Sequence, residues 1–108
     1  MEDALTQLAL ACQVRQEAGL LAQGDGTVLL AYPLKQGTVV GIGTGPGSEH
    51  MIRSVLRKRS EDLRRLGRWL PVLFNDGSCF VMIRVDDIPA DRPVVDSEML
   101  AAARELIS

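Results

Sequence analysis

The side chains that could do chemistry are few in this chain and lie far apart. His50 is the only histidine, and no catalytic serine–acid arrangement or metal-ligand spacing accompanies it. Asp86 and Asp87 are adjacent carboxylates, but they directly precede a proline-containing loop, where charged residues usually just end a strand. Catalysis needs a base, an orienting group and a nucleophile that converge. We therefore predict that the protein is not an enzyme, and that it holds no metal ion and no cofactor.

Residues 41–47 contain four glycines, and a glycine-rich loop before a helix can bind phosphate through free N–H groups. The spacing argues against such a site. Counted from Gly41, the last glycine position of a GxGxxG motif is occupied by Pro46. Counted from Gly43, it is occupied by Ser48, and no Gly-Lys-Ser/Thr follows. We expect a connector through which neither strand nor helix continues, with Ser48 as the N-cap of the next helix; a small-molecule pocket here is the least favoured function.

Two cysteines, Cys12 and Cys79, lie within apolar patterns and form no CxxC pair. We expect buried free thiols in a reducing cytosol, with a disulfide between them as the alternative. No apolar run approaches the roughly 20 residues that span a bilayer. The chain opens with Glu2 and Asp3 rather than with a basic segment before an apolar one. The expectation is a soluble, cytoplasmic protein with no membrane partner.

Hydrophobic periodicity predicts one α+β domain over residues 1–108, an antiparallel sheet with helices packed on it. The predicted order is helix, three strands, helix, two strands, helix. These elements are expected at residues 2–18, 20–22, 27–34, 38–42, 49–66, 69–74 and 78–85, followed by a last helix capped by Asp96.

The strongest local signal is Asn-Asp-Gly at 75–77, which predicts a tight type I′ turn because Asn and Asp before Gly tolerate positive φ. The strand 78–85 that follows is apolar on both faces, with Phe80 and Met82 on one of them. This pattern predicts a central strand, or a strand with one face kept for a partner.

The helix 49–66 opens a strongly basic stretch. Arg53, Arg57 and Arg64 lie close to one helical face and could grip a nucleic-acid backbone. Aromatic residues for stacking are scarce, so nucleic-acid binding or transcription control by this helix is kept as the alternative function. Arg59 interrupts the apolar stripe of the helix, which predicts a carboxylate partner or a solvent-exposed seam for its side chain.

The order of elements resembles that of the class I chaperones of bacterial type III secretion, which run α-β-β-β-α-β-β-α. The local likeness lies in the turn and strand at 76–84, in the start of the last helix at 94–100 and in the strand at 28–34. The resemblance implies a cytoplasmic chaperone, or chaperone-like regulator, of a virulence system. Such a protein dimerises and holds an extended segment of a secreted effector or regulatory protein without catalysis.

Two surfaces are predicted to carry this function. The partner's segment is expected to bind an apolar surface formed by Leu5, Leu8, Cys12, Leu30 and Tyr32. Self-association, as a homodimer or a heterodimer, is expected to use Leu56, Arg59, Leu63, Leu66 and Trp69.

Overall fold

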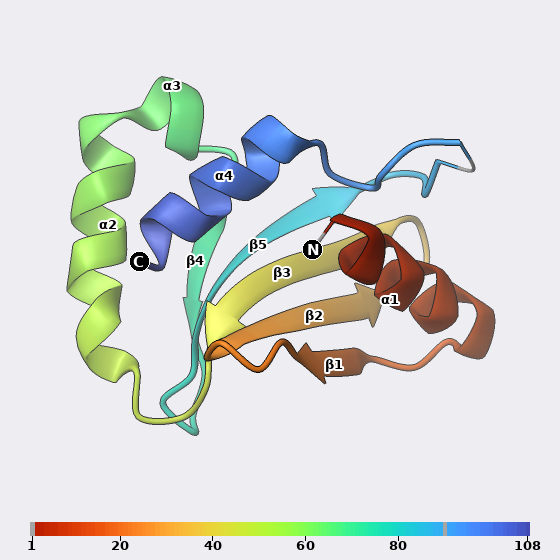
Figure 1. The fold of residues 1–108 in the computed structure, drawn as a ribbon, viewed down its shortest axis with the longest axis horizontal. Helices are drawn as coiled ribbons and strands as arrows, with labels where there is room; N and C mark the ends of the chain where they lie inside the picture. Colours follow the sequence, from red (N-terminus) through yellow and green to blue (C-terminus); the bar gives the residue numbers. More distant parts are fainter. Residues whose placement is uncertain (1, 90) are drawn as a thin grey trace.

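The computed structural model describes residues 2–89 and 91–108, and its five strands form one antiparallel sheet (Figure 1). The strand order is β1-β2-β3-β5-β4, so β5 is an inner strand. The α+β class and the antiparallel sheet are confirmed. In chain order the elements are α1 (Glu2–Arg15), β1 (Gly19–Ala22), β2 (Thr27–Pro33), β3 (Thr38–Thr44), the 3-10 helix η1 (Glu49–Met51), α2 (Ile52–Glu61), α3 (Leu63–Leu66), β4 (Leu70–Leu73), β5 (Cys79–Val85) and α4 (Ser97–Leu106).

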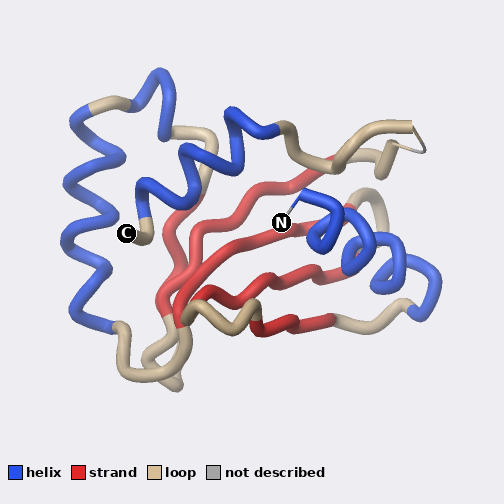
Figure 2. Tube along the Cα trace, viewed as in Figure 1, coloured by secondary structure: helices blue, strands red, loops and turns tan. Residues whose placement is uncertain are grey.

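The helices lie on one side of the sheet. Figures 1 and 2 show α1 and α4 across one face and α2 beside β4. Side chains from the helices and from this face of the sheet form a single apolar core, because strand residues alternate between the two faces. The core includes Leu5, Ala9, Leu29, Val40, Ile42, Val55, Leu66, Trp69, Val81, Ile83, Leu100 and Leu106.

No helix of the described residues lies on the opposite face of the sheet, and we call this the open sheet face. Residues paired across neighbouring strands share a face, so the register identifies its members. None of them belongs to the core described above. They form three rows: Leu20, Leu30, Gly41, Met82 and Leu70; Ala22, Val28, Gly43, Phe80 and Val72; and Tyr32, Val39 and Arg84.

The glycine-rich segment differs from its prediction, because β3 continues through Gly41 and Gly43 to Thr44. On the open sheet face these glycines lie opposite Met82 and Phe80 of β5. A Cβ atom at Gly43 would lie 2.5 Å from Phe80 Cγ and 2.4 Å from the carbonyl oxygen of Cys79. The missing side chains therefore make room for Phe80 and Met82, a tertiary requirement that local glycine content does not reveal.

The predicted helix 49–66 is divided. It begins as η1, and Asp62, with φ −145° and ψ 64°, separates α2 from α3. The N–H of Leu66 then donates to the carbonyl oxygen of Asp62 and starts a new turn. The Ser48 side chain does not cap the helix, because its hydroxyl donates to the carbonyl oxygen of Gly45 at 2.7 Å. The cap predicted at Asp96 is confirmed, since its carboxylate accepts from the N–H of Met99 at 2.8 Å.

The turn between β4 and β5 is not of type I′, which needs positive φ at two central residues. Only Gly77 in this turn has positive φ, at 85°. Its N–H donates to the carbonyl oxygen of Phe74, and the N–H of Phe74 donates to that of Ser78. The Asp76 carboxylate accepts from the hydroxyl and the N–H of Ser78 at 2.6 and 2.9 Å, and these bonds lower the pKa of Asp76.

Candidate functional site

The open sheet face is an apolar surface that the described helices leave uncovered. Its rim is the more exposed part: Leu20 is 67 % exposed, Leu70 56 % and Tyr32 52 %. Its middle is filled by Leu30 and Phe80, which are nearly buried although no helix lies over them. Large contiguous apolar patches on the surface of a soluble protein usually mark interaction sites.

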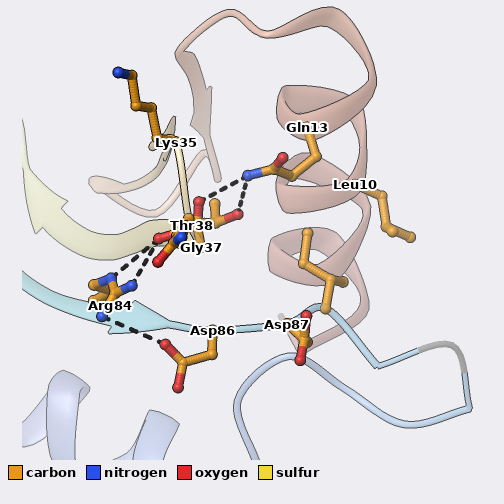
Figure 3. Close-up of a pocket in the computed structure, with 10 residues that line it drawn as sticks. Leu10, Gln13, Lys35, Gly37, Thr38, Arg84, Asp86 and Asp87 are labelled. Carbon is orange, nitrogen blue, oxygen red and sulfur yellow. Dashed lines mark hydrogen bonds and ion pairs between the residues drawn. The ribbon is translucent and has the colours of Figure 1, made fainter.

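Aromatic and polar contacts bound this face. Phe74, at the end of β4, packs edge-to-face on Phe80, with ring centroids 5.4 Å apart and planes at 79°. Arg84 is the only charged residue in the three rows. Its guanidinium donates to the carbonyl oxygen of Gln36 at 2.8 and 3.3 Å and pairs with Asp86 at 3.4 Å (Figure 3). These partners hold its charge at one end of the sheet, away from the apolar middle.

The two edges of the sheet differ in their capacity to accept another strand. At the β4 edge, Pro71 has no N–H to donate. Arg59 of α2 donates from Nε to the carbonyl oxygen of Trp69 and from Nη2 to that of Gly67, both at 2.9 Å. The backbone at the start of β4 is thus already occupied, and α2 lies beside this edge (Figure 1).

The β1 edge has none of these devices. β1 reads Gly-Leu-Leu-Ala, without proline or charge, and it has β2 on one side and no strand on the other in the described sheet. Leu20 pairs with Leu30 and belongs to the open sheet face, whereas Leu21 pairs with Leu29 on the helix-covered face. Both leucines are exposed. Natural sheets usually protect an edge with charge, proline, cover or a very short strand, and of these β1 has only its short length of four residues.

The five residues predicted to hold a partner are divided between the two faces of the sheet. Leu5 and Cys12 on α1 are buried, and Leu8 packs against the core. Leu30 and Tyr32 lie on the open sheet face, where only Tyr32 is substantially exposed. The structure does not bring these five side chains together on one surface.

Of the residues predicted for self-association, some are buried in the core and others are exposed. Leu66 and Trp69 are buried in the core, and the indole N–H of Trp69 donates to the carbonyl oxygen of Met99 at 3.0 Å. Leu56 and Leu63 are 49 % and 57 % exposed. Arg59 is half-buried and has main-chain carbonyls as its partners, so the prediction of a carboxylate or a solvent-exposed seam is wrong.

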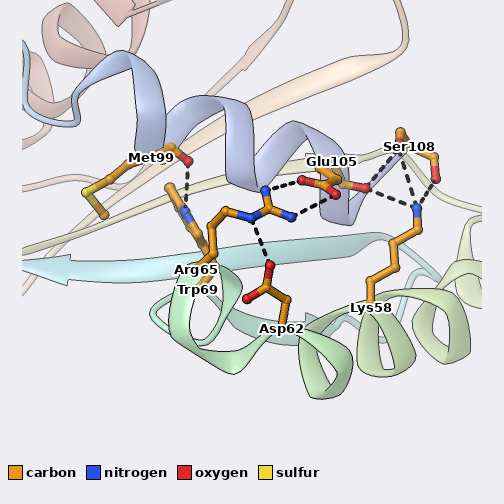
Figure 4. Close-up of polar contacts among 7 residues, drawn as sticks. All are labelled: Lys58, Asp62, Arg65, Trp69, Met99, Glu105 and Ser108. Carbon is orange, nitrogen blue, oxygen red and sulfur yellow. Dashed lines mark hydrogen bonds and ion pairs between the residues drawn. The ribbon is translucent and has the colours of Figure 1, made fainter.

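Part of the basic stretch holds α4 in place (Figure 4). The Lys58 ammonium donates to the carbonyl oxygens of Glu105 and Ser108 at 3.0 and 2.8 Å, at the C-terminus of α4, where a cation is favourable. The Arg65 guanidinium donates to the carboxylates of Glu105 and Asp62. This hydrogen bonding lowers the pKa of Glu105 and raises that of Arg65.

The remaining arginines of the predicted basic face, Arg53, Arg57 and Arg64, are exposed. No ion pair within the described part of the chain involves them. Arg53 and Arg57 lie on α2, whereas Arg64 lies on α3 beyond the break at Asp62. They are the cations of this helix pair that remain available to an external anion.

A cleft of about 620 Å³ lies between α1, the β2–β3 turn and the end of β5 (Figure 3). Within this cleft the side-chain amide of Gln13 donates to the hydroxyl of Thr38. It also donates to the carbonyl oxygen of Gly37, at 3.0 Å. The lining includes Asp86 and Asp87 but no histidine, cysteine or serine. The described lining residues include no Ser–His or Cys–His pair, and the hydroxyl of Thr38 accepts a hydrogen bond from Gln13.

The two cysteines are free and buried, as predicted, and burial raises the pKa of both thiols. In residues 2–89 and 91–108, no group of three or more His, Cys, Asp or Glu side chains is placed to hold a metal ion. The same residues include no helix with the length and apolarity needed to span a bilayer.

Comparison of the chain with protein-family models, with curated proteins and with solved structures finds no match. The open sheet face and the β1 edge were not singled out by sequence reasoning. The signal that could have pointed to them was the apolar character of both faces of 78–85 beside the glycines of β3.

Proposed function

We propose that this chain is a non-catalytic binding protein that holds an extended segment of a partner protein. In this role it would act as a type III secretion chaperone or a chaperone-like regulator. The proposed setting is the bacterial cytoplasm, with a secreted effector or regulatory protein as partner. The observation that carries the proposal is the contrast between the two sheet edges: the β4 edge contains Pro71 and follows carbonyl groups that Arg59 binds, whereas β1 is open and apolar.

The proposed binding mode is addition of a strand beside β1. An extended peptide pairs its backbone with a free sheet edge, and its side chains alternate between the two faces. On the open sheet face its side chains would extend the row formed by Leu20 and Leu30. On the helix-covered face they would lie beside Leu21. The favoured segment is therefore apolar at consecutive positions, not at every second one.

This chemistry suits an unfolded partner better than a folded one. A disordered segment loses conformational entropy on binding, so main-chain hydrogen bonds and apolar contacts must together exceed that cost. Leu20 and Leu21 are both substantially exposed in the free chain and would be covered by the added strand. Two leucines that bury most of their side chains supply roughly 2–4 kcal/mol together, which supports moderate, reversible capture.

The test uses two fluorescein-labelled peptides of eight apolar residues flanked by lysines, which differ only in that one of them has a proline at a central position. Fluorescence anisotropy should show binding of the unbroken peptide and at least about tenfold weaker binding of the proline-broken one, because proline interrupts strand pairing. Leu21→Lys should weaken binding of the unbroken peptide by about tenfold, since charge on an edge strand opposes pairing.

The matched control is Leu73→Lys, at an exposed leucine of the opposite edge. It should leave the affinity unchanged. Equal binding of the two peptides, or a loss with Leu73→Lys but not with Leu21→Lys, would refute capture at β1. Identification of the protein that co-purifies from native cytosol would then test the secretion role, which requires a secreted companion.

The alternative function, nucleic-acid binding or transcription control, is favoured by one observation: Arg53, Arg57 and Arg64 are exposed and make no ion pair with described residues. A mobility shift that weakens steeply with salt and is lost in Arg57→Glu with Arg64→Glu would support it. Absence of a shift at low salt with any duplex or single strand would exclude it.

A further inference from the structure

We propose that the open sheet face is the contact surface for a second copy of this chain, packed sheet against sheet as a two-layer sandwich about a two-fold axis. This inference goes beyond the proposed function and does not rest on it. Strand addition at β1 uses backbone groups that point along the plane of the sheet. A copy packed on the face leaves those groups accessible.

The distribution of residues on this face is that of an interface core and its rim. Apolar side chains occupy the middle, and the single charge, on Arg84, is held at one end by Gln36 and Asp86. Interface cores are depleted of charge and enriched in aromatic residues and methionine. Tyr32, Phe80 and Met82 supply those types here. Because a second copy presents the same uncharged surface, the contact involves no repulsion between like charges in its middle.

The shape of the face favours another sheet over a single extended segment. Gly41 and Gly43 leave room for Met82 and Phe80 to fill the space over β3, so Leu30 and Phe80 are nearly buried and form no open groove. An extended segment needs a groove or a free edge, which this face does not offer. Two sheets pack face to face about 10 Å apart when their inner faces carry interdigitating apolar side chains.

The area is sufficient for a specific contact. With strands about 4.8 Å apart and residues about 3.4 Å apart, three seven-residue and two four-residue strands cover roughly 480 Å² in plan. Two copies that meet over the whole face therefore remove roughly 950 Å² of plan area from water, which is close to the lower limit of about 1,000 Å² for a specific interface. The exposed rim, Leu20, Tyr32 and Leu70, lies on both sides of the middle and contributes the largest gain.

The outer surface of α2 and α3 is the competing choice for self-association. There Leu56 and Leu63 are exposed, but Arg53, Arg57 and Arg64 accompany them, while Leu66 and Trp69 face the core. Two copies meeting through this surface would bring arginines together with little apolar area between them. The open sheet face has the opposite balance.

The experiment measures the molar mass of the purified full chain by sedimentation equilibrium over a hundredfold range of concentration. The sheet-face variants are Tyr32→Glu and Leu70→Glu, and the matched controls are Leu56→Glu and Leu63→Glu on α2 and α3. All four side chains are between 49 % and 57 % exposed in the single chain, so the substitutions should preserve folding, which circular dichroism checks.

We expect a dimer for the wild-type chain and for both controls. Each sheet-face variant should raise the dimer dissociation constant by at least about a hundredfold, because the two-fold axis places the new charge in the contact twice. A wild-type chain that stays monomeric throughout would overturn the proposal. So would a dimer that persists in both sheet-face variants and is lost either in the controls or in Leu21→Lys, since contact would then be through the helices or the β1 edge.

Discussion

Arg59 and Trp69 are joined by a 2.9 Å hydrogen bond from the guanidinium Nε to the main-chain carbonyl oxygen, and the same guanidinium binds the carbonyl oxygen of Gly67. A side chain from the last turn of α2 thus fixes the path of the chain into β4. Since the guanidinium satisfies two carbonyl groups that no strand pairs with, it also decides which edge of the sheet remains available.

Replacement of Arg59 by Met keeps most of the side-chain stem and removes both hydrogen bonds. We expect Arg59→Met to lower the free energy of unfolding by about 1–3 kcal/mol, because two partly buried carbonyl groups lose a charged donor. Urea denaturation monitored by the fluorescence of Trp69 would measure the change. Arg57→Met, at an exposed position of the same helix, should alter it by less than about 0.5 kcal/mol. Equal effects of the two variants would contradict this assignment.

Addition of one methyl group at Gly43 should be costly. The new Cβ would meet Phe80 and the carbonyl oxygen of Cys79 at less than 3 Å, and neither can move freely within the sheet. We expect Gly43→Ala to destabilise the chain by about 1–3 kcal/mol, as overpacking usually does. Gly45→Ala is the control, because nothing lies within 4 Å of its Cβ position. Thermal unfolding that ranks Gly45→Ala as the more damaging change would show that the close approach is not real.

The two thiols should be nearly inert in the folded chain. Burial raises the pKa of Cys12 and of Cys79, so little thiolate forms at neutral pH, and the sulfur atoms are shielded as well. We predict slow reaction with Ellman's reagent in buffer and rapid reaction of two thiols in concentrated urea. Reaction of either thiol in buffer at the rate of free cysteine would be incompatible with the burial described here.

The contact between Arg65 and Glu105 predicts an acid dependence of stability. The hydrogen bond from Arg65 lowers the folded-state pKa of Glu105. The stabilisation is therefore complete above the unfolded-state pKa of this carboxyl and is lost as pH falls through its lower folded-state pKa. Unfolding of the wild-type chain and of Glu105→Gln should be compared from neutral to acid pH. The variant should lose less stability than the wild type as the pH falls, and identical slopes would disprove the linkage.

Apolar periodicity predicted the strands well, because β2, β3 and β5 each bury one side in the core. The ends agree with the structure to within one residue, except that β3 runs on to Thr44. The break at Asp62 and the passage of β3 through Gly41 and Gly43 were not predictable in this way. Both depend on contacts with residues far away in the sequence, which become known only with the strand register.

The residues of the two predicted surfaces were also predictable only in part. Leu5, Cys12 and Leu66 are apolar residues at helical spacing. Such a pattern predicts that a side chain is packed, but it does not say whether the packing partner is the same chain or another protein. In the structure their surroundings belong to the same chain. Leu30 and Tyr32 stand on a face that no described helix covers. Because both faces of β5 are apolar, sequence patterning could not tell which one the helices would occupy.

The difference between the two edges of the sheet limits how far copies of this chain can assemble by strand pairing. Cross-β fibrils grow because every added strand offers a fresh, equivalent margin to the next chain. Here a chain that donates or accepts backbone pairing through β1 presents Pro71 and the occupied carbonyl groups of Gly67 and Trp69 at its far margin. Propagation stops after one step. An apolar strand that would otherwise be an aggregation hazard can therefore stay uncovered in this chain.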